Sequence, residues 1–141
     1  MNNPQKFFLA AIALLLFSSM SCKKTDNCSA GSGGAVTIVA FPQHHTAPII
    51  SESKPGYPDS AFIKFSPPID FVATYNPADY DLVIVGDSGE DHVHIPNLRC
   101  GDYFIVMTGW DPSIPSRVKG GIPTSFTQTS GEIVLDVPVS E

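Results

Sequence analysis

The chain has 141 residues, is 43% apolar, contains thirteen prolines and carries a formal net charge of −6. This length is typical of one domain that buries its own core without a structural metal or a dense set of disulfides. The excess of acidic side chains argues against nucleic acid as a partner, because phosphate binding requires clustered Lys and Arg side chains.

The first residues are typical of an export signal. Lys6 precedes an apolar run over 7–17, and small residues follow up to Cys22. The run is shorter than the about 20 apolar residues that a membrane-spanning helix needs, so we predict a cleaved signal peptide over 1–21. Cys22, followed by Lys23 and Lys24, resembles the start of a bacterial lipoprotein. The resemblance implies that Cys22 is acylated and anchors the protein to a bacterial membrane, in the periplasm or facing the cell surface; plain secretion is the alternative.

Residues 22–34 are rich in Lys, Ser and Gly and predict a flexible tether, with one domain over 35–141. Two cysteines remain after Cys22, namely Cys28 and Cys100. In an oxidising compartment an even pair favours a disulfide. Two separate thiols are the alternative, because the sequence does not reveal whether the two Cα atoms approach each other.

Short runs of β-branched and aromatic residues, separated by Pro, Gly, Asp and Asn, predict an all-β fold without helices. The seven expected strands span 36–41, 60–65, 80–85, 92–95, 103–110, 124–128 and 132–139. Ala61 and Ile63 alternate with Lys64, and apolar residues over 132–139 alternate with Glu132 and Asp136. Two packed antiparallel sheets would bury one face of each strand, so we predict a seven-stranded Greek-key, Ig-like β-sandwich.

Aromatic side chains in or beside the long connections are candidates for ligand binding. Tyr57, Tyr75 and Trp110 occupy such positions. Exposed aromatic rings on a rigid sandwich contact sugars or partner proteins in many binding modules. The alternative for Trp110 is that its ring only closes the end of the core.

The histidines suggest a metal site. His92 and His94 alternate with Val93 and Ile95, so both imidazoles should project from one strand face and could chelate zinc or copper together. His44 and His45 would supply a third ligand if their loop lies nearby. An exposed strand face that tolerates histidine is the alternative.

The tetrapeptide at 86–89, Gly-Asp-Ser-Gly, is also found around the nucleophile of trypsin-like proteases, and His44, Asp70 and Ser88 follow in the same order. The same tetrapeptide suits a hairpin turn, which is the interpretation we favour. Five carboxylates between Asp79 and Asp91 could bind calcium, but their spacing does not match an EF-hand loop. We expect no catalytic residue and no cofactor.

An Asp, a Gly, an apolar strand, a Leu and a Gly-x-Tyr step follow one another over 87–106. The residues that carry this pattern are Asp87, Gly89, Ile95, Leu98, Gly101 and Tyr103. The pattern resembles prealbumin-like β-sandwiches, including carboxypeptidase regulatory-like domains and the B-type repeats of Gram-positive adhesins. The resemblance implies that Leu98 closes the end of the core, that Gly101 takes a positive φ and that Tyr103 forms a tyrosine corner.

The start of the chain and the segments 44–49 and 119–123 also resemble small envelope lipoproteins of the Bacteroidetes type. Other features of related families are missing: 36–41 has no Lys and 132–141 no Asn for an isopeptide cross-link, and the C-terminal Tyr-Arg-Gly-Ser motif of transthyretin-related hydrolases is absent. We therefore expect a non-enzymatic, membrane-tethered module that binds protein or glycan. A metal-dependent factor using His92 and His94, and a bare structural spacer, are the alternatives.

Overall fold

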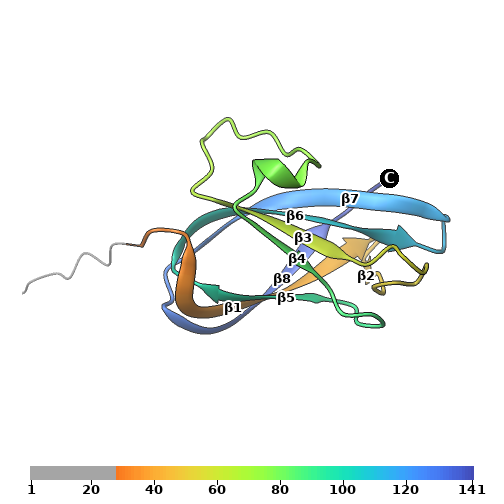
Figure 1. Ribbon diagram of the computed structural model, residues 1–141, viewed down its shortest axis with the longest axis horizontal. Coiled ribbons are helices and arrows are strands. Elements are labelled where there is room, and N and C mark those ends of the chain that lie inside the picture. Colours follow the sequence, from red (N-terminus) through yellow and green to blue (C-terminus); the bar gives the residue numbers. More distant parts are fainter. Residues whose placement is uncertain (1–27) are drawn as a thin grey trace, which may run out of the picture.

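The computed structural model describes residues 28–141, which form two packed β-sheets (Figure 1). The strands are β1 (Ser32–His44), β2 (Ala47–Pro48), β3 (Ser60–Phe65), β4 (Leu82–Val85), β5 (Val93–Leu98), β6 (Gly101–Asp111), β7 (Ser116–Phe126) and β8 (Ser130–Pro138). A turn of 3-10 helix, η1 (Pro77–Asp79), lies in the loop between β3 and β4. Within the described residues no helix is long and apolar enough to cross a bilayer.

The first sheet, called the β1 sheet, contains β1 paired with β2, β5 and β8, and the second, called the β6 sheet, has the order β4-β3-β6-β7. The connections from β4 to β5 and from β5 to β6 cross between the sheets. Pairing is antiparallel throughout the described strands except between β1 and β8, which run parallel. The expectation of purely antiparallel strands was wrong for this pair, because side-chain alternation indicates which face is buried but not strand direction.

The predicted all-β sandwich is confirmed, with the two-residue β2 as the additional strand. Its core consists of apolar side chains from both sheets. The largest completely buried side chains are those of Tyr103, Ile38, Ile63, Ile95, Leu98, Ile105, Met107, Val36, Val93, Val106, Val118 and Val137. Ala61 and Ile63 point inward as their alternation with Lys64 predicted.

The strand bounds agree with the prediction for β3 and differ for the others, most of all at the starts of β7 and β1. β7 begins at Ser116 rather than at 124, although it contains Gly120, Gly121 and Pro123. It is an edge strand, where a missing backbone N–H is tolerated. β1 begins at Ser32, so the ordered domain starts earlier than the expected boundary near 35.

The corner between β5 and β6 holds the N-terminal segment. Cys28 and Cys100 form a disulfide, which selects between the two alternatives that the sequence left open. The Tyr103 hydroxyl donates to the carbonyl oxygen of Arg99 and accepts from the Gly31 amide at 3.0 Å. The Arg99 amide donates to the Gly31 carbonyl at 2.9 Å. The predicted tyrosine corner is therefore formed, and it extends to the segment before β1.

The glycine and leucine positions of the 87–106 pattern also have their expected conformations. Gly89 has φ 85° in the turn between β4 and β5, and Gly101 has φ 147° at the start of β6. Leu98 is fully buried. β4 pairs with β3 and β5 pairs with β1, so the expectation of a hairpin here was wrong, and the turn at 86–89 instead connects the two sheets.

Candidate functional site

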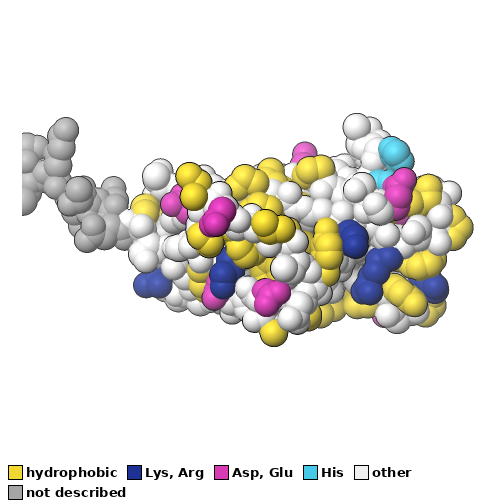
Figure 2. Space-filling view, turned by 90° about the horizontal axis from the view of Figure 1, so that it is seen from above, with side chains coloured by type: hydrophobic (Ala, Val, Ile, Leu, Met, Phe, Trp, Pro, Cys, Tyr) yellow, Lys and Arg dark blue, Asp and Glu magenta, His cyan; other side chains and the backbone are white. Residues whose placement is uncertain are grey.

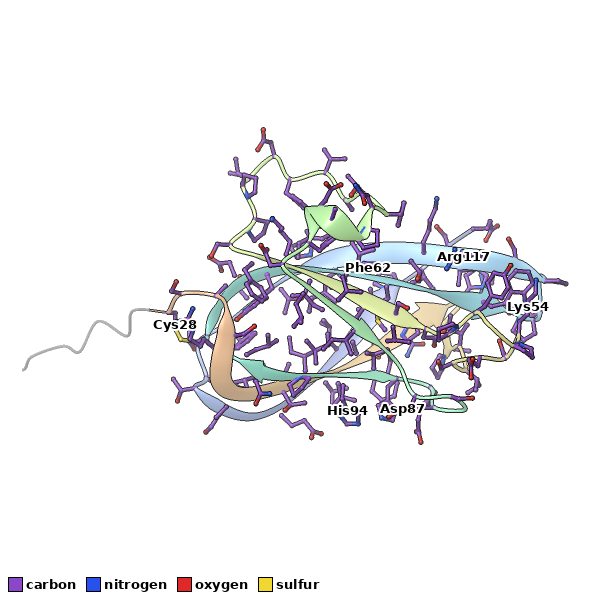
Figure 3. All side chains as sticks on the ribbon, in the orientation of Figure 1. Cys28, Lys54, Phe62, Asp87, His94 and Arg117 are labelled. Atoms are coloured by element: carbon purple, nitrogen blue, oxygen red, sulfur yellow. A yellow bond between two sulfur atoms is a disulfide. The ribbon has the colours of Figure 1, made fainter. Side chains whose placement is uncertain are left out.

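One end of the outer face of the β6 sheet carries aromatic and basic side chains (Figure 3). Val118 on β7 is completely buried, so Arg117 and Lys119 on either side of it point to the outer face. The register pairs Arg117 with Trp110 and Lys119 with Thr108 on β6. Two cations and an indole ring therefore lie side by side on neighbouring strands.

Lys54 and Tyr57, from the loop between β2 and β3, pack onto Trp110. Lys54 Nζ lies 3.7 Å from the centroid of the Trp110 ring and 4.3 Å from that of Tyr57. The Tyr57 and Trp110 ring centroids are 5.1 Å apart, and the Ser53 hydroxyl donates to the Trp110 carbonyl at 2.8 Å. The two distances from Lys54 Nζ to the rings are within the range of cation–π attraction. The contacts fix the loop against β6.

A pocket of about 200 Å³ adjoins these residues. It is lined by Phe62, Tyr75, Thr108, Arg117 and Lys119. Lys119 Nζ lies 4.2 Å from the centroid of the Tyr75 ring, and Arg117 Cζ lies 5.7 Å from that of Tyr57. Arg117 thus joins the pocket to the loop. We call the six residues Lys54, Tyr57, Tyr75, Trp110, Arg117 and Lys119 the aromatic–basic patch.

The three cations of the aromatic–basic patch differ from Lys64, on the same face, in their ion pairing. Among the described residues none of the three forms an ion pair with a carboxylate, whereas Lys64 on the same face pairs with Asp81 at 3.3 Å. Figure 2 shows Lys and Arg side chains gathered among hydrophobic ones toward one end of this face. In a chain of net charge −6 this is a local concentration of positive charge that can receive an anion.

The aromatic–basic patch lies far from the point where the described chain begins. In Figure 3 Cys28 is at one end of the sandwich, and Lys54 and Arg117 are at the other.

The three aromatic residues proposed from the sequence therefore gather at one end of one face. Lys54, Arg117 and Lys119 were not anticipated. The alternation of Arg117 and Lys119 around the apolar Val118 could have indicated a strand with both cations on one face. The strand was not predicted there, because the Gly and Pro residues that follow disfavour strands.

The four predicted metal ligands form two separate pairs. His92 and His94 project from the same face of β5, with Nε2 atoms 3.0 Å apart, while Val93 and Ile95 are buried. His92 Nδ1 lies 2.8 Å from an Asp91 carboxylate oxygen. If His92 donates through Nδ1, its Nε2 carries a lone pair directed at His94. This confirms the predicted face, but His44 and His45 belong to a different cluster.

The second cluster surrounds His44, the last residue of β1. His44 Nδ1 lies 2.5 Å from Asp111 Oδ2, and Nε2 lies 3.2 Å from Glu141 Oε2. The His45 ring centroid is 4.0 Å from that of His44. His44 and Asp111 are only 4% and 6% exposed, so this pair is well shielded from water.

The carboxylates set the charge of this cluster. The hydrogen bond from His44 to Asp111 raises the pKa of His44, although burial opposes it. A hydrogen bond from Ser113 and the His44 imidazole lower the pKa of Asp111. The backbone amide of Glu141 and the contact with His44 lower the pKa of the Glu141 carboxyl. Both carboxylates are therefore ionised at neutral pH.

The approach of β8 to β7 brings Glu141 to this position. A Cβ atom at Gly120 would collide with the carbonyl oxygen of Pro138, so only glycine allows this approach. Lys119 and Ser140 then exchange two backbone hydrogen bonds of 2.8 and 3.0 Å. Asp111 and Glu141 were not predicted from the sequence, because Asp111 ends β6, Glu141 follows β8, and they approach His44 only through tertiary packing.

Other predicted sites are placed as follows. Ser88 lies in the turn that connects β4 to β5, and His44 contacts Asp111 and Glu141 rather than Asp70. Asp81 is paired with Lys64. Cys22 and the signal peptide over 1–21 lie outside the described residues. No family model, curated protein or solved structure is similar enough to this chain to count as a match, and so only its own residues indicate a role.

Proposed function

We propose that the protein is a non-enzymatic binding module of the bacterial cell envelope, tethered through lipid on Cys22. Its recognition surface would be the aromatic–basic patch, which offers solvent-accessible rings and three cations without a carboxylate partner among the described residues, at the end of the sandwich remote from Cys28. That combination is the observation on which the proposal depends. Aromatic rings provide flat apolar contact area, and the cations add selectivity for negative charge.

The chemistry of the patch favours an acidic glycan over a protein ligand. A sugar ring can stack on an aromatic side chain, while Arg117 and the two lysines would bind carboxylate or sulfate groups. The neighbouring pocket of about 200 Å³ is smaller than the cavities that hold drug-sized ligands and suits one sugar residue. A polymer of repeating acidic sugars would engage both the pocket and the rings of the loop.

Trp110→Ala and Arg117→Gln are each expected to weaken binding to an acidic polysaccharide at least about tenfold, the loss for a contact worth about 1.4 kcal/mol. The full chain would be run in native gels containing polygalacturonate, chondroitin sulfate or neutral dextran. Retardation by at least one acidic polymer should weaken as salt is added, because the cations are accessible to solvent. Lys64→Gln is the matched control, since Lys64 is on the same face but already paired with Asp81.

Unchanged retardation in both variants would rule out the patch as the binding surface. Absence of binding to either acidic polymer, with Trp110-dependent capture of an envelope protein, would replace the glycan by a protein ligand. A chain that loses no partner in either assay when Trp110 is removed would be a spacer.

Metal binding through His92 and His94 is the second candidate function, supported by the 3.0 Å distance between their Nε2 atoms and by the carboxylate of Asp91 behind His92. A carboxylate that orients a histidine is a common feature of metal sites. Protein purified without a His tag is expected to contain copper or zinc that is lost in the His92→Ala/His94→Ala variant. Elemental analysis checks this, and equal metal content in the variant would remove this candidate.

A further inference from the structure

The last residue of β1, the turn that follows it and Glu141, which lies beyond β8, bring together three groups that can bind a metal. One ligand atom each from His44, His45 and Glu141 lies within 4.8 Å of the others. Zinc bonds of about 2.0–2.2 Å place neighbouring ligands of a tetrahedral site about 3.4 Å apart. The observed His44 Nε2 to Glu141 Oε2 distance is 3.2 Å, so small side-chain rotations would complete a three-ligand site.

Asp111 orients His44 for this purpose. Its carboxylate accepts the Nδ1 proton of His44 at 2.5 Å and is itself held by the Ser113 amide at 2.7 Å. In the protonated imidazole Nε2 donates to Glu141, and a metal ion that replaces this proton would be bound by the Nε2 lone pair between His44 and Glu141. A carboxylate bound to the far nitrogen of a histidine ligand fixes the ring and raises its basicity in metal sites. His44 is buried, so this orientation is held by packing as well.

The charge and space around the cluster also suit a divalent cation. Asp111 and Glu141 place two carboxylates on one imidazole, and a cation between His44 and Glu141 would balance them. A pocket of about 300 Å³, lined partly by His44, His45 and Asp111, gives access from solvent. The turn that carries His45 is strained, because His45 and Thr46 have φ of 50° and 71° without being glycine.

The geometry points to a metal site formed by His44, His45 and Glu141, with Asp111 as the positioning residue, which binds Zn²⁺ through two imidazoles and one carboxylate. Imidazole and carboxylate ligands with an open fourth position are typical of zinc sites. Glu90, Asp91 and His92 form a second group of three possible ligands, but it contains one imidazole, whereas the His44 cluster offers two imidazoles and a buried, oriented first ligand. The proposed zinc site is separate from the proposed glycan binding, because no residue of the aromatic–basic patch is a metal ligand in it.

The test uses the full chain carrying His92→Ala/His94→Ala, which leaves His44 and His45 as the remaining histidines of the four in the sequence. After treatment with chelator this protein is expected to bind one Zn²⁺ per chain in calorimetry, with micromolar or tighter affinity. Co²⁺ should give the visible absorption of a tetrahedral site. Added Zn²⁺ should raise the melting temperature, because the ligand binds the folded state.

His45→Ala and Glu141→Gln, each added to that background, are expected to weaken Zn²⁺ binding at least about 100-fold, because each removes one of three ligands. Both side chains are exposed, so the fold should survive. Glu132→Gln is the matched control, an exposed glutamate on β8 that leaves binding unchanged. Asp111→Asn should weaken Zn²⁺ binding about 10- to 100-fold, as loss of an orienting partner does.

Absence of stoichiometric Zn²⁺ binding in the His92→Ala/His94→Ala background, or equal binding after His45→Ala and Glu141→Gln, would overturn the proposal. Metal that disappears with His92 and His94 alone would assign binding to β5 instead. Polysaccharide retardation is read separately, so the failure of one proposal leaves the other intact.

Discussion

Replacing both Cys28 and Cys100 with alanine will lower the free energy of unfolding by about 4 kcal/mol. The disulfide joins residues 72 positions apart, and in the chain-entropy model a bridge of this span removes much of the freedom of the unfolded chain. It also holds the segment that bonds to Arg99 and Tyr103. Urea unfolding of oxidised wild type and of the double variant, monitored by tryptophan fluorescence, measures the difference.

Reduction provides the control for this experiment. Dithiothreitol should lower the urea midpoint of the wild type toward that of the double variant and leave the double variant unchanged. A wild-type midpoint that does not respond to reductant, once complete reduction is verified by mass, would show that the bridge does not stabilise the fold.

Asp59→Asn is expected to stabilise the protein at about pH 8 by about 2 to 4 kcal/mol. Asp59 precedes β3 and is fully buried, and its carboxylate oxygens have no hydrogen-bond partner among the described residues. The absence of a side chain at Gly109 makes room for it, since a Cβ atom there would collide with Oδ1. Burial raises the pKa of Asp59 from 3.8 to about 7.

The direction of the pH effect follows from this pKa. Between about pH 4 and about pH 7 the folded state holds a proton that the unfolded chain has lost, so the free energy of unfolding falls as pH rises and then levels off. Each pKa unit corresponds to about 1.36 kcal/mol, which gives a fall of up to about 4 kcal/mol. The side-chain amide introduced by Asp59→Asn does not ionise, so the variant should lack this component.

Urea unfolding of both proteins at several pH values between about 4 and 8 measures the effect, and the expected signature is a difference that is small at low pH and grows toward neutrality. Asp81→Asn serves as the comparison, because Asp81 is a surface residue paired with Lys64 and its loss should cost at most about 1 kcal/mol. A pH-independent difference between wild type and Asp59→Asn would contradict the buried, proton-binding carboxyl.

The parts of the fold that follow from local patterns were predictable. The alternation around Ile63 gave the orientation of β3, and the pattern from Asp87 to Tyr103 gave the turn at Gly89 and the tyrosine corner. That turn joins strands of different sheets and does not close a hairpin, because the pattern identifies a turn but not the partners of the strands beside it. Direction and partners of distant strands are not encoded in such patterns. The parallel pairing of β1 with β8 depends on the path of the whole chain, which explains why it was missed.

In the candidate sites too, local patterns identified some residues, whereas others come together only through tertiary packing. Tyr57, Tyr75 and Trp110 were identified as aromatic residues near loops, but the contact of Lys54 with Trp110 requires a loop to fold back onto β6. His92 and His94 were placed on one face by alternation alone. Asp111 and Glu141 reach His44 only because two strand ends converge, and no spacing in the sequence indicates that.

The bridge between Cys28 and Cys100 also determines how the domain bears mechanical load. A pull on the chain ahead of Cys28 is transmitted through the sulfur atoms to Cys100, and β1 is bypassed, so it cannot be peeled from its sheet. From Cys100 the tension runs directly along β6, the strand that ends beside Trp110. A ligand held at that ring and an anchor at the other end would thus be connected by one disulfide bond and one extended strand.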